Sequence, residues 1–207
     1  MESGSYEHRR TLLSDQLRQR GSGPVRLDKP TSNLFRSRDK TPRQMLDVSA
    51  FHHVLNVDSE ACTIDTEGMT TYDKLVDSAL VHDLMPAVVP QLKSITIGGA
   101  VSGIGIESSS FNYGLVHETV LEMDVLLGSG EVVTCTANNE YQDLFFGLPN
   151  SYGTLGYILR VKALAVPAQP YVQLTHLRIP NTDDFFTTIE SWCVDDVDFV
   201  DGVVFQR

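Results

Sequence analysis

Apolar and polar residues alternate in short runs along the chain, and this period of two predicts β-strands. Such runs lie at residues 45–49, 53–58 and 62–68, and the polar residues 58–60 predict a hairpin between the second and third runs. A longer alternating run at residues 118–136 predicts another hairpin, which turns at its Gly-Ser-Gly sequence.

Helical spacing of apolar residues marks other segments. Residues 5–20 place Leu12, Leu13 and Leu17 on one side of a helix, and the Gly-Ser-Gly-Pro sequence at residues 21–24 ends it. Further helices are predicted at residues 71–85, 140–147 and 182–193. Because strands and helices mix along the chain, the predicted fold class is α+β.

The pattern changes after Pro167, where a predicted strand over residues 153–167 ends. Beyond it come a predicted strand at residues 171–179, the helix at 182–193 and a last strand at 197–205. These three elements predict the opening of a second α+β unit that the chain does not complete.

The stretch SITIGGAVSGIGIESSS, residues 94–110, carries four glycines. Glycine lets backbone N–H groups approach a phosphate closely and gives access to positive φ. A Rossmann site is not indicated, because the GxGxxG pattern is broken at Ser108, and no GxxxxGK[ST] supports a P-loop. A glycine-lined loop remains, and two interpretations stay open: a cofactor loop and a plain structural turn. A second glycine pair, Gly153 and Gly156, favours the cofactor loop.

The charge of the chain limits the kinds of molecule that we expect it to bind. The formal net charge of −11 argues against a nucleic-acid partner. Residues 1–43 nevertheless carry ten Lys and Arg against five Asp and Glu, so the N-terminal extension, residues 1–24, is basic. This arm could meet a cofactor phosphate, an anionic membrane or an acidic face of the same chain, or simply be solvated.

The sequence carries no targeting signal that we recognise. No apolar run approaches the roughly 20 residues of a transmembrane helix, and the N-terminus lacks the apolar core of a secretory signal. The three cysteines lie far apart without a CxxC pair, which indicates reduced thiols. We therefore expect a cytoplasmic protein, with membrane association left open. The six histidines show no metal-ligand spacing, so we expect no metal site.

Three segments together resemble a known family: TIGGAVSGIGIESSS, YGLVHETVLEMDVLLGSGEVV and DLFFGLPNSYGTLGYILRV. They are similar to the FAD-binding (PCMH-type) domain of the vanillyl-alcohol-oxidase superfamily, and most to its sterol Δ24-reductase branch. The resemblance runs from about Asn33 to Ile179. It implies two α+β subdomains with FAD between them over residues 25–168, and the beginning of a substrate-binding domain over residues 169–207.

The resemblance also implies positions for FAD. One segment would line the flavin and its diphosphate: Thr96, Ile97, Gly98, Gly99, Ala100, Val101, Ser102, Gly103, Ile104, Gly105, Ile106, Glu107 and Ser108. Gly153, Thr154 and Gly156 would lie near the ribityl or adenosine side. Many members attach FAD to a histidine in a glycine-rich loop, but residues 33–49 here contain neither glycine nor histidine. We therefore expect non-covalent FAD, with Arg36 or Arg38 meeting the phosphates instead.

In the sterol branch the flavin takes hydride from NADPH and reduces a carbon–carbon double bond, and the cofactor carries this chemistry. The resemblance thus implies an FAD-dependent oxidoreductase with a small lipid or alcohol substrate and peripheral membrane contact. Residues that shape a sterol pocket would lie beyond Arg207, so no catalytic residue is assigned. Two alternatives stay open: a non-catalytic flavin-binding or interaction fragment, and an FAD-dependent oxidase of an alcohol or sugar.

Other side chains have competing interpretations. His117 could approach the flavin or be an ordinary structural histidine. Glu107 could tune the flavin or relay a proton, or it could anchor N–H groups of its own loop. Tyr113 and Tyr152 could stack on a ligand or simply pack.

Overall fold

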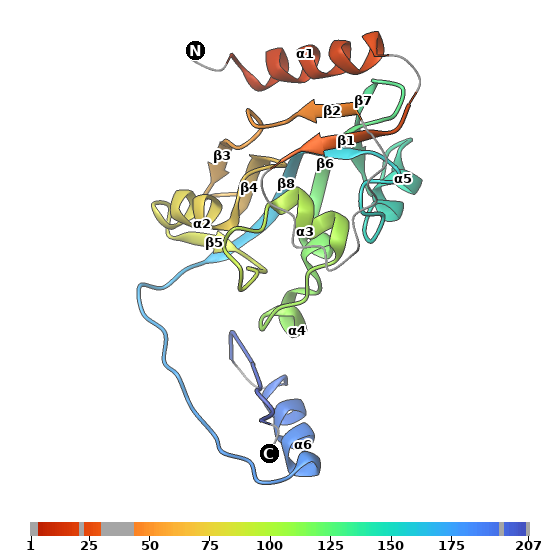
Figure 1. Ribbon diagram of the computed structural model, residues 1–207. Helices are drawn as coiled ribbons and strands as arrows, with labels where there is room; N and C mark the ends of the chain where they lie inside the picture. The colour runs from red at the N-terminus through yellow and green to blue at the C-terminus, as the bar shows by residue number, and fades with distance from the viewer. Residues whose placement is uncertain (1–3, 21–22, 30–43, 195–196, 206–207) are drawn as a thin grey trace.

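The computed structural model describes residues 4–20, 23–29, 44–194 and 197–205, and an antiparallel sheet lies at its centre (Figure 1). Five strands cross this sheet in the order β3 (Val54–Asp58), β4 (Thr63–Glu67), β8 (Tyr157–Pro167), β6 (Val120–Leu126) and β7 (Val132–Thr136). A short strand, β5 (Leu84–Pro86), pairs with the end of β8. The long β8 is therefore the strand to which both halves of the sheet are bonded.

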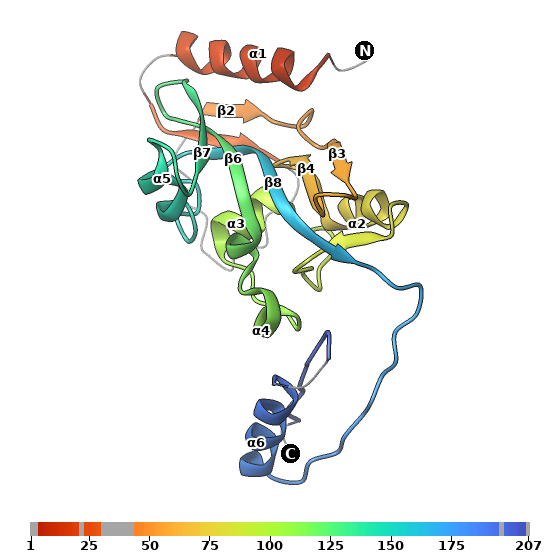
Figure 2. The ribbon, with the colours of Figure 1, turned by 180° about the vertical axis from the view of Figure 1, so that it is seen from behind.

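Helices and a smaller sheet cover the two faces of the central sheet (Figure 2). The smaller sheet is a parallel pair, β1 (Val25–Asp28) and β2 (Gln44–Asp47). The remaining elements are α1 (Tyr6–Gln19), α2 (Tyr72–Leu80), α3 (Ile97–Gly103), α4 (Ser110–Tyr113), η1 (Val116–Thr119), α5 (Gln142–Gly147) and α6 (Thr182–Trp192).

Two apolar clusters hold these layers together. The larger one joins α2, α3 and α5 to one face of the sheet, with Leu75, Val101 and Val125 at its centre. The smaller one joins α1 and the β1–β2 pair to the other face through Leu17 and Leu126. Neighbouring residues of β6 thus point to opposite clusters, as the period of two requires.

Most predicted elements are confirmed, and the fold class is α+β as expected. The predicted helix at 71–85 is wrong in its second half, because α2 ends at Leu80 and Asp83 adopts a φ of 56° before β5. Of the three leucines that were placed on one side of α1, Leu13 and Leu17 are buried, whereas Leu12 is 56% exposed, since adjacent helical residues lie about 100° apart.

The strands predicted at 171–179 and 197–205 are wrong. Neither segment forms a strand, because no described strand offers it backbone partners. Their apolar side chains stay exposed, for example Tyr171 at 88% and Phe205 at 86%. The parallel strand β1 was not predicted, because four residues with alternating charge give little signal. Among the described helices, none has the length and hydrophobicity needed to cross a bilayer.

A buried ion pair fixes α1 to the sheet. Glu67, at the end of β4, is fully buried, and Arg9 of α1 pairs with it through Nε, which donates to Glu67 Oε1 at 3.0 Å. The backbone N–H of His53 donates to the second oxygen, Oε2, at 2.8 Å. Nearby, Tyr6 donates from its hydroxyl to Asp124 of β6 at 2.6 Å. The basic N-terminal extension therefore meets an acidic face of its own chain.

Replacement of Arg9 by alanine should destabilise the protein by about 3 kcal/mol, because it leaves the Glu67 carboxylate buried without its cation. Urea unfolding followed by circular dichroism measures this loss. Gln16→Ala, at an exposed position of the same helix, is the control and should change stability by less than about 0.5 kcal/mol. The double variant Arg9→Met/Glu67→Leu should recover part of the loss; a loss as large as in Arg9→Ala would contradict the ion-pair explanation.

Candidate cofactor-binding site

The glycine stretch forms a short helix and then a turn, rather than the loop expected from its composition. Helix α3 occupies Ile97–Gly103, and Thr96 caps it by accepting the N–H of Gly99 on Oγ1 at 3.3 Å. The helix packs on the sheet through Ile97 and Val101, which are buried. Apolar spacing and a threonine cap thus override the low helix propensity of glycine.

The first turn of α3 is bonded to the rest of the protein. The N–H of Ile97 donates to the carbonyl of Thr70 at 3.0 Å, and that of Gly98 donates to the carbonyl of Gly68 at 2.9 Å. With Gly99 bonded to its cap, these three donors are already satisfied. The start of α3 therefore offers a ligand few backbone donors.

The glycines have two different roles. A Cβ on Gly98 would lie 2.8 Å from the carbonyl oxygen of Gly68, and one on Gly156 would lie 2.9 Å from that of Leu126. At these positions glycine allows backbones to approach. Gly103 is different, because a Cβ there would meet only the ring of Tyr152, at an ordinary 3.7 Å.

The turn after α3 is strained and has unused donors. Ile104 has a φ of 56°, an uncommon conformation for a β-branched residue. No acceptor in the described part of the chain takes the N–H groups of Ile104, Gly105 or Ile106. Strain of this kind is often kept at binding sites, and successive free N–H groups suit an anion or a polar ring edge.

The structure brings the second glycine segment against the first. The N–H of Tyr152 donates to the carbonyl of Ser102 at 3.2 Å. Three residues of this loop have positive φ: Asn150, Tyr152 and Gly153. The hydroxyl of Thr154 donates to the carbonyl of Ser151 at 2.8 Å, and this bond stabilises the loop that contains both residues. Gly153 and Thr154 thus lie on the segment that contacts α3.

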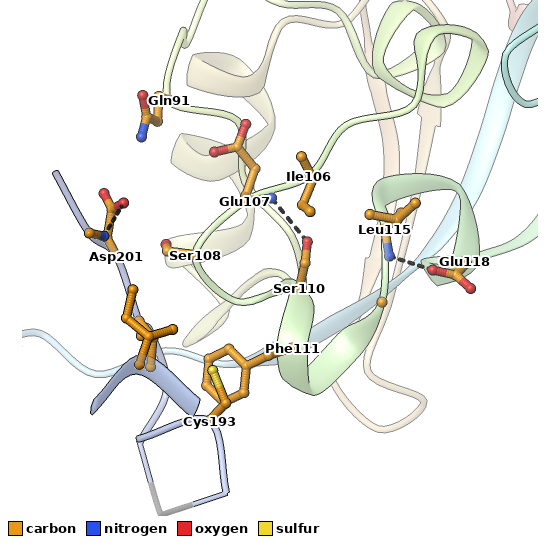
Figure 3. Close-up of a pocket in the computed structure, with 14 residues that line it drawn as sticks. Gln91, Ile106, Glu107, Ser108, Ser110, Phe111, Leu115, Glu118, Cys193 and Asp201 are labelled. Carbon is orange, nitrogen blue, oxygen red and sulfur yellow. Dashed lines mark hydrogen bonds between the residues drawn. The ribbon is translucent and has the colours of Figure 1, made fainter. Parts of the chain in front are cut away.

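A cavity of about 500 Å³ lies beside this turn (Figure 3). Its walls come from the segment after α3 and from the C-terminal segment: Gln91, Ile106, Glu107, Ser108, Ser110, Phe111, Gly114, Leu115, Glu118, Ile189, Cys193, Val200, Asp201 and Gly202. Two hydrogen bonds join the walls, from Val200 N to Ser108 O at 2.9 Å and from Asn112 Nδ2 to Val197 O at 3.0 Å. No motif near residue 200 indicates a contribution to this cavity.

Glu107 is the titratable group of this cavity with a shifted pKa. Burial raises the pKa of its carboxyl, a backbone hydrogen bond from Gln91 lowers it, and the Asp201 carboxylate raises it again, with a net increase. Its own N–H donates to Ser110 Oγ at 3.0 Å. Glu118, by contrast, accepts the N–H of Leu115 at 2.6 Å and caps η1.

Two polar atoms near the site are buried without a partner in the described residues: Nδ1 of His117 and Oγ of Ser151. Orphaned polar atoms are uncommon in native structures and suit a missing ligand or water. Arg36 and Arg38, predicted to meet the phosphates, lie outside the described residues. The described residues contain no cluster of side chains suited to a metal ion.

Similarity to a known protein family indicates which ligand this site suits. The family described as "FAD binding domain" matches residues 25–136, more than half of the chain. The chain belongs to this family. The matched range includes β1, α3, the strained turn and the first wall of the cavity, and it confirms the family predicted from the glycine motifs.

The curated proteins to which the chain is similar include two sterol reductases and a cytokinin dehydrogenase. Delta(24)-sterol reductase of Pisum sativum is 35% identical over 131 residues, which cover 63% of this chain and 23% of that protein. The protein of that name from Arabidopsis thaliana is 31% identical over 169 residues, covering 78% and 30%. Cytokinin dehydrogenase 7 of Oryza sativa subsp. japonica is 31% identical over 122 residues, covering 59% and 23%. The chain spans less than a third of the length of these relatives.

The described residues fit FAD. The free N–H groups after α3 can bind polar edges of a flavin or its phosphates, and the open face of Gly103 leaves room for a ligand. The orphaned Nδ1 of His117 and Oγ of Ser151 offer further hydrogen bonds. These features suit the cofactor that the family name states.

Gly98→Ala should destabilise the protein by about 1–3 kcal/mol, because the new Cβ would clash with the backbone of Gly68. Gly103→Ala is the matched control. It should leave stability unchanged or raise it by up to about 1 kcal/mol, because alanine favours a helix more than glycine. Thermal unfolding of both variants checks this. Equal destabilisation would contradict the different environments of the two glycines.

Glu107 should titrate above the usual glutamate range, and Asp201→Asn should lower its pKa only in part, because burial is the larger cause. Side-chain carboxyl NMR shifts followed between pH 3 and about 8 measure both values. Asp183→Asn, an exposed substitution on α6, is the control and should leave Glu107 unchanged. A complete return to the ordinary value in Asp201→Asn would contradict the role of burial.

Proposed function

We infer that the chain binds FAD non-covalently and forms the flavin-binding part of an oxidoreductase. The observation that carries this proposal is the strained turn after α3, with three unused N–H groups beside a cavity of about 500 Å³. Family membership supports FAD as the ligand of that turn. The proposed cofactor segment is the one named from the sequence, residues 96–108, together with Gly153, Thr154 and Gly156.

FAD, when bound, supplies hydride and electron transfer. The residues of the chain bind and orient it: the turn at 104–106 donates N–H groups, and Gly103 gives the ligand access. Apolar side chains such as Phe111 and Leu115 line the cavity and exclude water. The raised pKa of Glu107 keeps a proton on its carboxyl to a higher pH than usual, which suits a group that donates a proton.

The proposed reaction is the reduction of a carbon–carbon double bond in a sterol-like lipid, with NADPH as the electron donor. Similarity to two plant Delta(24)-sterol reductases supports this substrate class. Because the chain spans less than a third of those proteins, reaction, substrate and donor are proposals for the whole protein. A lipid substrate would also place the protein in the cytoplasm at a membrane surface, through peripheral contact.

The second candidate function is that of an FAD-dependent oxidase that acts on a substrate other than a sterol. Similarity to cytokinin dehydrogenase 7 supports it, because the substrate in the name of that protein is not a sterol. An FAD-dependent oxidase of an alcohol or sugar would release peroxide in air during turnover, whereas a reductase would consume NADPH without matching peroxide. A chain that binds FAD and does neither would be a flavin-binding module.

The purified chain should bind FAD, retain it through a desalting column and release it in acid. Absorbance between 350 and 500 nm measures the retained flavin. Gly103→Phe should lose most of it, because the ring would fill the open face beside Tyr152. Gly128→Phe is the control, since a side chain there meets open space in the β6–β7 turn.

Three outcomes are distinguishable. Flavin retained by the wild type and Gly128→Phe but lost by a folded Gly103→Phe supports the proposed site. Flavin retained equally by all three places the cofactor elsewhere. Absence of flavin from a folded wild type at saturating FAD contradicts the proposal, and circular dichroism verifies folding in each case.

A further inference from the structure

A single cationic side chain lies over the start of α3. Lys29 directly follows β1, and its Nζ lies 3.7 Å from the position that a Cβ on Gly99 would occupy. The sequence does not indicate this contact, because β1 and α3 are far apart in the chain. From the sequence alone, Lys29 is one of several basic residues of the N-terminal region.

Lys29 has no counter-ion in the part of the chain that the structure describes. No hydrogen bond or ion pair reaches its ammonium there, although the side chain is half-buried. Burial lowers the pKa of this ammonium. A half-buried cation without an anion costs free energy, and an anionic ligand at the same place would offset that cost.

The backbone does not replace Lys29 as a source of positive charge at this place. The N–H groups of Ile97, Gly98 and Gly99 are bonded to Thr70, Gly68 and Thr96. An anion at the start of α3 would therefore depend on the ammonium rather than on the helix.

The segment that contains α3 carries no carboxylate of its own. Between Asp83 and Glu107 there is no Asp or Glu, although the chain as a whole has a net charge of −11. Asp28 precedes Lys29, but successive residues of an extended chain point to opposite sides. Lys29 thus lies over the first turn of α3, while the carboxylates of the neighbouring segment are engaged: Glu67 by Arg9 and Asp73 by the hydroxyl of Thr71.

We propose that the Lys29 ammonium binds the diphosphate of FAD at the start of α3. This inference rests on the proposed FAD function and adds a specific residue for the anionic part of the cofactor. FAD carries two phosphates that riboflavin lacks, so the contribution of Lys29 should appear with FAD alone. NADPH carries a diphosphate too, and the experiment separates the two dinucleotides.

The test compares the dissociation constants of FAD, riboflavin and NADPH for the full chain by flavin or nicotinamide fluorescence. Lys29→Met should weaken FAD binding about ten- to hundredfold, as expected for one charge-assisted contact. It should leave riboflavin unchanged, and Lys29→Arg should keep most of the affinity for FAD. Lys93→Met is the matched control, because it removes an exposed lysine close to α3 in sequence.

Each remaining outcome overturns the inference. Equal FAD affinity in the wild type and Lys29→Met shows that the ammonium does not contact the cofactor, while the proposed function stands. Equal weakening of FAD and riboflavin indicates a general structural effect, and so does a loss as large in Lys93→Met. Weakening of NADPH alone assigns Lys29 to the other dinucleotide. A wild type that binds no FAD overturns the proposed function and this inference together.

Discussion

The close approach of three backbone segments at Gly68 determines where the rest of the site lies. The N–H of Gly68 donates to the carbonyl of Leu159 in β8 at 2.7 Å, and its own carbonyl accepts from Gly98 in α3 at 2.9 Å. A Cβ on Gly68 would lie 2.1 Å from the carbonyl oxygen of Ile158, so no other residue fits without a shift of the backbone. This contact seats α3 directly on the long central strand, and the turn after α3 is positioned from there.

The same contact divides the donors of the glycine stretch into two groups. Donors at the start of α3 bond to the sheet side, where they stabilise the fold. Donors after α3, at 104–106, face away from those acceptors and remain free. Ile104 accepts a strained φ at this boundary, and packing of Val101 and Val116 in the large cluster holds the strained turn in place. The backbone donors that are bonded within the fold and those that are free for a ligand therefore lie at different ends of one glycine-rich segment.

Local patterns were enough to predict the hairpins, α1 and α6, because alternation and helical spacing act within a few residues. The glycine stretch was expected as a loop, but α3 forms there because its threonine cap and apolar spacing outweigh its glycine content. The resemblance supplied the family. The failed strand predictions and the early end of α2 depend on partners distant in sequence. Residues 171–179 are β-prone but have no described neighbour strand, and the helix predicted through 85 ends early because β5 pairs with β8. The approach of Lys29 to Gly99 and of Val200 to Ser108 also depends on tertiary structure, so no local motif signals either contact.

Charge distribution explains how an acidic protein can suit an anionic dinucleotide. Arginines contact most carboxylates of the central sheet: Arg160 contacts Asp65, Glu122 and Asp124, and Arg9 pairs with Glu67. These networks lie on the α1 face, opposite the cluster that seats α3. The segment that contains α3 and the turn after it has no Asp or Glu between Asp83 and Glu107. Salt screens exposed charges over a Debye length of about 8 Å at physiological ionic strength, and the sheet lies between the acidic network and the face that would hold phosphates. A net charge of −11 is therefore compatible with one localised anion site.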